Sequence, residues 1–74
     1  KPRYLAGKML RMSDEALLIK LADRLDNLSD LQFADKDFSH RYPRETKYIV
    51  KYLFMNRELT SAHKQLIQYI NGTI

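Results

Sequence analysis

The sequence predicts an all-α protein of three or four helices packed on a central helix, and three observations favour this class. Apolar residues recur at spacings of three and four in several segments, as they do on one face of a helix. Side chains typical of helix N-caps, such as Ser13 and Thr60, stand before two of these segments. The chain has 74 residues, 45% of them hydrophobic, which allows one small domain with a core.

The central helix is predicted from Ser13 to Leu31. Ser13 is a suitable N-cap, and the acidic residues that follow it suit the positive end of the helix dipole. Seven apolar residues then form one broad arc: Leu17, Leu18, Leu21, Ala22, Leu25, Leu28 and Leu31. Four residues form a polar stripe on the other side: Lys20, Asp23, Asn27 and Asp30.

The polar stripe consists mainly of Asp and Asn, which are poor helix formers because their short side chains compete for the backbone. Ile19 falls between Asp23 and Asp26 on the helical wheel, so we expect part of this sector to be covered by protein. Two interpretations remain open: a site for a metal or nucleotide, or an ordinary amphipathic helix with solvated Asp residues.

Three further helices are expected around the central one. The first covers residues 2–11, with Pro2 in its first turn. After a loop over residues 32–39, a third helix is expected to start at Pro43 and to bury Tyr48, Ile49, Tyr52 and Leu53, with Phe54 as a further candidate. Thr60 or Ser61 caps a last helix, which Gly72 ends.

At Leu21-Ala22-Asp23-Arg24-Leu25, followed by Asn27, the chain resembles the HD-superfamily phosphohydrolases. It is most similar to the hydrolase domain of the alarmone (guanosine tetraphosphate and pentaphosphate) synthetase/hydrolase family. The similarity extends to residues 8–20 and to Arg44-Glu45-Thr46, and it covers roughly residues 5–55. It implies that the chain is part of an HD-like helical domain.

The resemblance also implies roles for single residues. Asp23 would be the last protein ligand of a divalent metal, typically manganese, and Asn27 would lie by the ribose and phosphate groups of the substrate. Lys20 and Asp30 would border the substrate, and Arg24 would make a phosphate contact or a structural salt bridge. Because Arg24 projects toward the apolar arc, we expect the salt bridge, with Glu45 as partner. Such a metal lowers the pKa of a bound water and directs it at phosphorus.

Two departures from the family pattern bear on substrate and activity. Asp26 and Asp30 stand where the family has His and often Thr, and added carboxylates repel an anionic substrate, so a phosphoester other than the guanosine polyphosphate is a second possibility. No His-Asp pair occurs, so the upstream metal ligands are missing. We therefore expect a C-terminal HD segment over residues 1–74, trimmed, proteolytic or degenerate, that is inactive without its N-terminal segment or a second chain.

A rival hypothesis is a non-catalytic helical interaction module. The net charge of +4 comes from basic residues spread along the sequence, which indicates solubility and does not favour nucleic acid as a partner. No apolar run reaches the length of a membrane span and no secretory signal opens the chain, so a cytoplasmic protein is expected. His40 and His63 lack ligand partners at metal-site spacing and are predicted to be surface residues.

Overall fold

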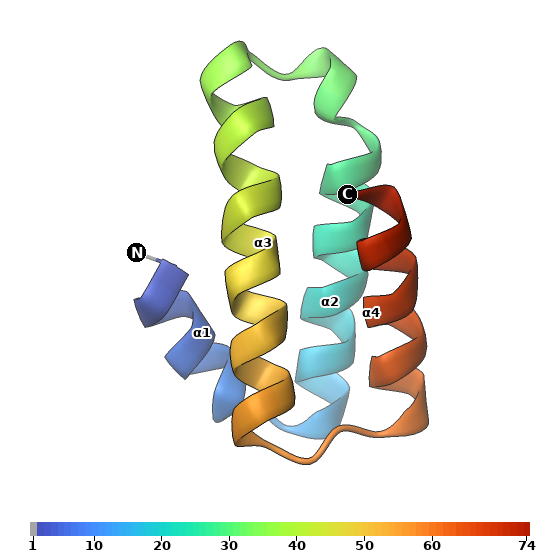
Figure 1. Ribbon diagram of the computed structural model, residues 1–74. Helices are drawn as coiled ribbons and strands as arrows, with labels where there is room; N and C mark the ends of the chain where they lie inside the picture. Colours follow the sequence, from blue (N-terminus) through green and yellow to red (C-terminus); the bar gives the residue numbers. More distant parts are fainter. Residues whose placement is uncertain (1) are drawn as a thin grey trace.

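The computed structural model describes residues 2–74, which form four α-helices and one short 3-10 helix (Figure 1). In chain order these elements are α1 (Pro2–Leu10), α2 (Asp14–Ser29), η1 (Leu31–Phe33), α3 (Lys36–Asn56) and α4 (Ser61–Thr73). No strand occurs in this range. The prediction of an all-α fold is confirmed.

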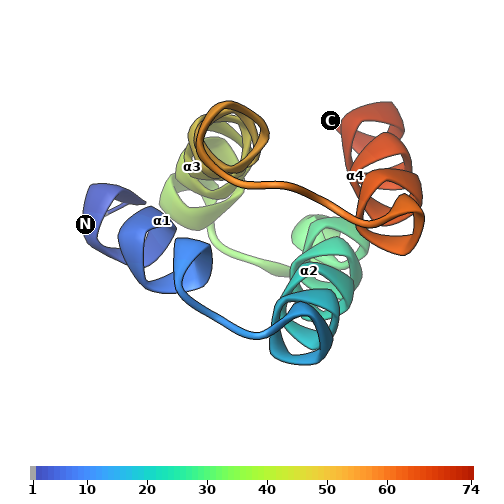
Figure 2. The same cartoon turned by 90° about the horizontal axis from the view of Figure 1, so that it is seen from below.

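The helices form two packed pairs. α2 packs along α4, and α1 packs along α3, while α2 and α3 touch at fewer points. Figure 2 shows the four helices seen from below, with α2 and α3 on opposite sides of the bundle. One core lies between the pairs, and its buried hydrophobic members come from all four helices: Ala6, Met9, Leu17, Leu21, Leu28, Tyr42, Ile49, Val50, Leu53, Ile67 and Ile70.

α2 begins as predicted and ends slightly earlier. The Ser13 side chain accepts a hydrogen bond from the Ala16 backbone N–H at 3.1 Å, so Ser13 is the N-cap. At the other end the N–H of Asp30 donates to the carbonyl of Asn27 at 3.2 Å, three residues back, which tightens the last turn. α2 therefore stops at Ser29, and the predicted last residue of the helix lies in η1.

α3 begins at Lys36, seven residues before the predicted start at Pro43. A proline inside a helix removes a backbone hydrogen bond and costs about 3 kcal/mol, which is the reason to expect a boundary there. Two contacts favour the longer helix. The Asp35 carboxylate caps it by accepting from the Phe38 N–H at 2.8 Å, and the Phe38 ring stacks on Tyr42 with centroids 4.7 Å apart. Half of the predicted loop thus belongs to α3. Tyr48 and Phe54 are 42% and 50% exposed, so the prediction that they are buried is wrong for these two residues.

α4 is capped by Thr60, one of the two predicted caps, and it continues through Gly72 to Thr73. Thr60 Oγ1 accepts from the His63 N–H at 3.2 Å, and His63 Nδ1 accepts from the Thr60 N–H at 3.1 Å, which makes a reciprocal capping box. His63 is 1% exposed, so the prediction of a surface histidine is wrong for this residue.

Arg57 ties the first helix to the rest of the bundle. Its Nη1 donates to the backbone carbonyls of Met9, Leu10 and Met12 at 3.3, 3.2 and 2.8 Å, respectively. Its Nη2 donates to the Asp14 carboxylate at 2.8 Å. Because the last carbonyls of a helix have no partner within it, this guanidinium satisfies the C-terminal end of α1.

Within residues 2–74, none of the helices has the length and apolar character needed to cross a bilayer.

Candidate functional site

The polar stripe lies on the outward face of α2. The side chains of Lys20, Asp23, Asn27 and Asp30 are all exposed, and they alternate along the helix with the buried residues of its inner face. Ile19 shares the outward face and is 70% exposed, so the described part of the chain does not cover it as we expected. The candidate site is thus an open helix face that carries one exposed aliphatic side chain among carboxylates.

Asp23 stands at the edge of a shallow apolar hollow. The hollow has a volume of about 300 Å³ and is lined by Met12, Ala16, Ile19, Lys20 and Asp23. Most of its wall is hydrocarbon, with one cation and one carboxylate at its polar end. A surface of this kind suits an apolar side chain with a charged group beside it.

The exposed side chain of Asn27 on α2 is held in place by Tyr42 on α3. Its Nδ2 donates a hydrogen bond to the Tyr42 hydroxyl at 3.1 Å. The Tyr42 ring is 8% exposed and stacks on Phe38, so the hydroxyl has a fixed position. The amide oxygen of Asn27 remains free to accept from another group, since the tyrosine occupies only the NH2 group.

Arg24 does not make the expected salt bridge with Glu45. The guanidinium is buried between α2 and α3, with Nη1 donating to Thr46 Oγ1 at 2.8 Å and its Cζ 4.3 Å from the centroid of the Tyr42 ring. Thr46 Oγ1 in turn donates to the Tyr42 carbonyl at 2.8 Å. Arg24 therefore anchors α2 to α3 and does not reach the outward face where a phosphate could bind.

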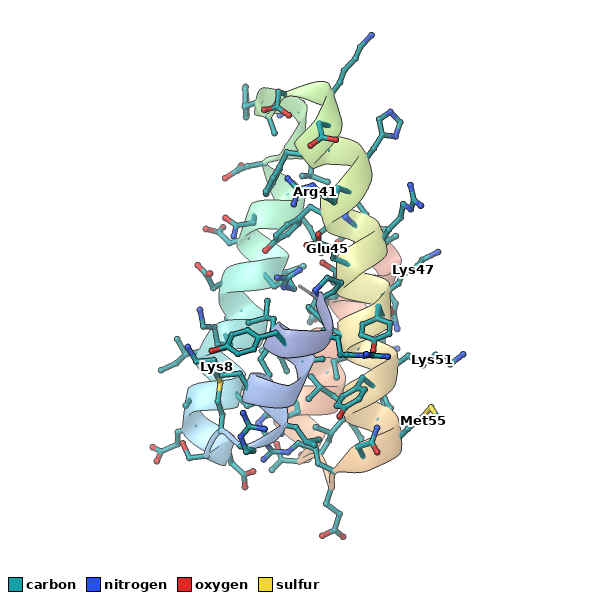
Figure 3. The ribbon with its side chains drawn as sticks, turned by 90° about the vertical axis from the view of Figure 1, so that its left-hand side faces the viewer. Lys8, Arg41, Glu45, Lys47, Lys51 and Met55 are labelled. Carbon is teal, nitrogen blue, oxygen red and sulfur yellow. The ribbon has the colours of Figure 1, made fainter. Side chains whose placement is uncertain are left out.

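Glu45 has a different partner. Arg41 Nη1 lies 3.3 Å from Glu45 Oε2, and Arg41 Nε lies 3.5 Å from Asp37 Oδ2 (Figure 3). The hydrogen bond to Glu45 raises the pKa of the Arg41 guanidinium, and the charges of Glu45 and Asp37 add to this effect. Asp37, Arg41 and Glu45 follow one another by one helical turn, and Asp37 and Arg41 are exposed while Glu45 is half-buried. Ion pairs at this spacing add only a few tenths of a kcal/mol (~0.3–0.5).

The carboxylates of α2 do not complete a metal site by themselves. Among residues 2–74 no three His, Cys, Asp or Glu side chains are grouped so that they could hold a metal ion. Asp23, Asp26 and Asp30 are all exposed on one side of α2 and offer carboxylate oxygens to the same side. Carboxylate oxygens of this kind suit a hard divalent cation, but on their own they provide only part of a ligand set.

The two histidines are far from a catalytic arrangement. His40 is exposed on α3, as predicted. His63 is buried in the capping box, and its Nε2 lies 2.8 Å from the carbonyl of Asp14. Since Nδ1 accepts from the Thr60 N–H, Nε2 carries the proton and donates to that carbonyl. Its role in the bundle is structural.

The sequence analysis did not identify Tyr42 and Thr46 as partners of the site residues. Tyr42 is not among the predicted site residues, and Thr46 belongs only to the Arg44-Glu45-Thr46 segment of the family resemblance. One available signal was the spacing of four between them, which places both on one face of a helix that includes Pro43. The early start of α3 brings that face onto α2.

Comparison of the chain with protein-family models, with curated proteins and with solved structures gives no match.

Proposed function

We propose that the chain is the C-terminal part of an HD-type, metal-dependent phosphohydrolase domain similar to the alarmone hydrolases. Asp23 is the last protein ligand of a divalent metal, and Asn27 contacts the ribose or phosphate groups of the substrate. The observation that supports this most is the division of residues 21–27 on α2. Leu21 and Arg24 are buried, whereas Asp23 and Asn27 are exposed one turn apart on the outward face.

The fixed position of Asn27 supports a binding role. A solvated asparagine gains little from a partner, because its amide exchanges freely between water molecules. Here the NH2 group bonds to the hydroxyl of Tyr42, which is itself packed under Arg24. This network fixes the orientation of the Asn27 amide oxygen, as is typical of a group that orients a ligand.

The outward face of α2 exposes Ile19 among carboxylates, which supports our proposal that other parts of a full domain cover this face. In the full domain a His and a His-Asp pair on other helices supply the remaining ligands, and these helices cover Ile19 and the hollow beside it. Manganese accepts carboxylate and imidazole ligands, and when bound it supplies a water of lowered pKa directed at phosphorus. Asp23 then binds and positions the metal, while Lys20 lies on the same face as a cation for phosphate oxygens.

Substrate choice follows from the charge of this face. A guanosine polyphosphate carries several negative charges, and Asp26 and Asp30 lie on the same side of α2 as Asp23. Like charges oppose its approach unless the metal or additional cations compensate them. We therefore propose guanosine tetraphosphate as the first substrate to assay and a less charged phosphoester as the second.

The experiment is an assay of the chain joined to the segment encoded upstream of it. With manganese present, release of pyrophosphate from guanosine tetraphosphate, or hydrolysis of a second phosphoester, is expected. Asp23→Asn should lower the rate at least about 100-fold, because it removes a metal ligand. Asp37→Asn removes the same charge from an exposed site on α3 and should leave the rate unchanged.

The proposal fails if the upstream segment contains no His and His-Asp pair, or if Asp23→Asn and Asp37→Asn have equal rates. Manganese binding gives a separate readout, since Asp23→Asn should weaken it by about 10-fold to 100-fold even without turnover.

A non-catalytic interaction module is the second candidate, and the exposure of Ile19 favours it. An aliphatic side chain 70% exposed beside an apolar hollow is suited to burial by another chain. In this case Ile19→Glu should weaken association with a second chain, whether another copy or the upstream segment supplied in trans. Asp23→Asn should have little effect on this association. The enzyme hypothesis predicts instead that Asp23→Asn lowers activity more than Ile19→Glu does.

A further inference from the structure

The outer edge of α3 gathers positive charge that is dispersed in the sequence. Arg44, Lys47 and Lys51 follow one another at spacings of three and four, so they share one side of the helix, and all three are exposed. None of them forms a salt bridge within residues 2–74. Figure 3 shows Lys47 and Lys51 projecting from α3 in the same direction, away from α1. The bundle thus has a row of unpaired basic side chains along one side of α3.

Two hollows lie in a row along this edge and share Tyr48. The first has a volume of about 440 Å³ and is lined by residues that include His40, Arg44 and Tyr48. The second has a volume of about 420 Å³ and lies between Tyr48, Lys51, Tyr52 and Met55. We call the surface formed by these two hollows and Lys47 the α3 edge.

One exposed aromatic side chain, Tyr48, lies among the cations. Tyr48 is 42% exposed, and its ring is stacked on Tyr52 with centroids 6.2 Å apart, which holds it in place. Met55 is 73% exposed and follows at the end of the second hollow. Two acids, Asp37 and Glu45, also line the first hollow. Both are paired with Arg41, so their charges oppose an anion less than free carboxylates would.

We propose that the α3 edge binds single-stranded nucleic acid. Free cations in a row follow a phosphate backbone, and a supported aromatic ring between them offers a face on which a base can stack. From His40 to Met55 the helix rises about 22 Å, which suits a site of a few nucleotides. In the sequence the basic residues are dispersed, which argues against a nucleic-acid partner. In the structure α3 brings Arg44, Lys47 and Lys51 onto one side of a helix.

This inference is independent of the proposed hydrolase function. The candidate hydrolase residues lie on α2, whereas the basic residues and Tyr48 of the α3 edge all lie on α3, so the two sets share no residue. A result on one face therefore leaves the other untouched.

The experiment measures fluorescence anisotropy of labelled oligouridine and oligothymidine, each about 12 nucleotides long, a length within known site sizes. Binding is expected at about 50 mM salt and should weaken steeply toward about 200 mM. Lys47→Gln combined with Lys51→Gln should flatten the slope of log K against log salt by about 1.4, since each contact to a single strand contributes about 0.7.

Tyr48 tests the stacking part of the proposal. Tyr48→Leu should weaken binding about 10-fold with the same salt slope, whereas Tyr48→Phe, which keeps the ring, should bind like the unchanged protein. Lys8→Gln combined with Lys64→Gln is the matched control. It removes two exposed positive charges from α1 and α4, and it should leave the salt slope unchanged. Circular dichroism of each variant verifies the helical fold.

Four outcomes would overturn the proposal. The first is no binding of either oligonucleotide at low salt, and the second is an equal loss in the control pair. The third is polyglutamate binding as tightly as the oligonucleotides, which would assign the edge to an acidic protein instead. The fourth is a duplex of the same length binding as tightly as the single strands.

Discussion

Two buried polar side chains, Arg24 and His63, make hydrogen bonds that join different parts of the bundle. A buried polar group without a partner is costly, and no buried side-chain nitrogen or oxygen among the described residues lacks one. Arg24 bonds to Thr46 on α3, and His63 bonds to Thr60 and to the start of α2. Each of these residues therefore specifies which helices meet.

Thr46→Val should lower the free energy of unfolding by about 1–3 kcal/mol. The replacement keeps the shape of the side chain but removes the hydroxyl oxygen that accepts from Arg24, so a buried guanidinium loses its partner. Urea unfolding followed by circular dichroism gives this value. Thr73→Val is the control, because that hydroxyl bonds only to the carbonyl of Tyr69 on an exposed turn. Equal effects of the two changes would contradict the role of Thr46.

His63→Phe should also destabilise the protein by about 1–3 kcal/mol. The aromatic ring is kept, but the Thr60 N–H and the Asp14 carbonyl both lose their partner. His40→Phe makes the same change at an exposed histidine and should shift the midpoint of urea unfolding very little. A loss of stability only in the His40 variant would contradict the capping role of His63.

Among the helices, the position of α1 depends on Arg57, the residue that directly follows α3. α1 has nine residues, too few for an isolated helix to be stable in water. The carbonyls of Met9 and Leu10 accept hydrogen bonds from Arg57, which lies 48 and 47 residues further along the chain, respectively. The short first helix is therefore a tertiary feature, held by its packing on α3 and by one guanidinium.

Arg57→Leu should loosen α1 more than the remainder of the bundle. We expect a loss of about 2 kcal/mol, because hydrogen bonds from a charged donor contribute about 1.5–3 kcal/mol. Hydrogen exchange of the α1 amides should accelerate more than that of α2.

Asp14→Asn is the matched comparison for this change. It removes only the ion pair to Arg57. Because the Asp14 side chain is 62% exposed, this change should cost less than about 1 kcal/mol. A larger cost for Asp14→Asn than for Arg57→Leu would assign the stabilisation to the ion pair instead.

For the molecule as a whole, stability depends on one small core between two helix pairs. A chain of this length is expected to have a free energy of unfolding of about 4–11 kcal/mol, from about 0.05–0.15 kcal/mol per residue. A single large cavity is therefore comparable with the total. The two pairs should unfold together, because the same core residues join them.

Ile49→Ala should remove about 2–5 kcal/mol, since this side chain is fully buried on α3 and its loss leaves a cavity. Thermal unfolding by calorimetry should show one transition at a clearly lower temperature. Ile19→Ala changes the same residue type at a site 70% exposed and should leave the transition nearly unchanged. Two separate transitions in the unchanged protein would contradict a common core.

The all-α class, the caps at Ser13 and Thr60, and the two faces of α2 were predictable from the sequence. Each depends on residues within one or two helical turns of one another, so local spacing contains the information. The start of α3 was not predictable in this way. Pro43 is locally a helix boundary, and the Asp35 cap and the stacking of Phe38 on Tyr42 outweigh its cost.

For the candidate site, the sequence by itself determined that Asp23 and Asn27 share one face of a helix. Only the tertiary structure decided that Arg24 is a buried anchor and that Tyr42 holds Asn27, because both contacts join residues 15 or more positions apart. The same is true of His63, whose burial depends on the packing of α4 against α2. Helical periodicity fixes which side chains point the same way, whereas the pairing of helices fixes which of them are buried and what they contact.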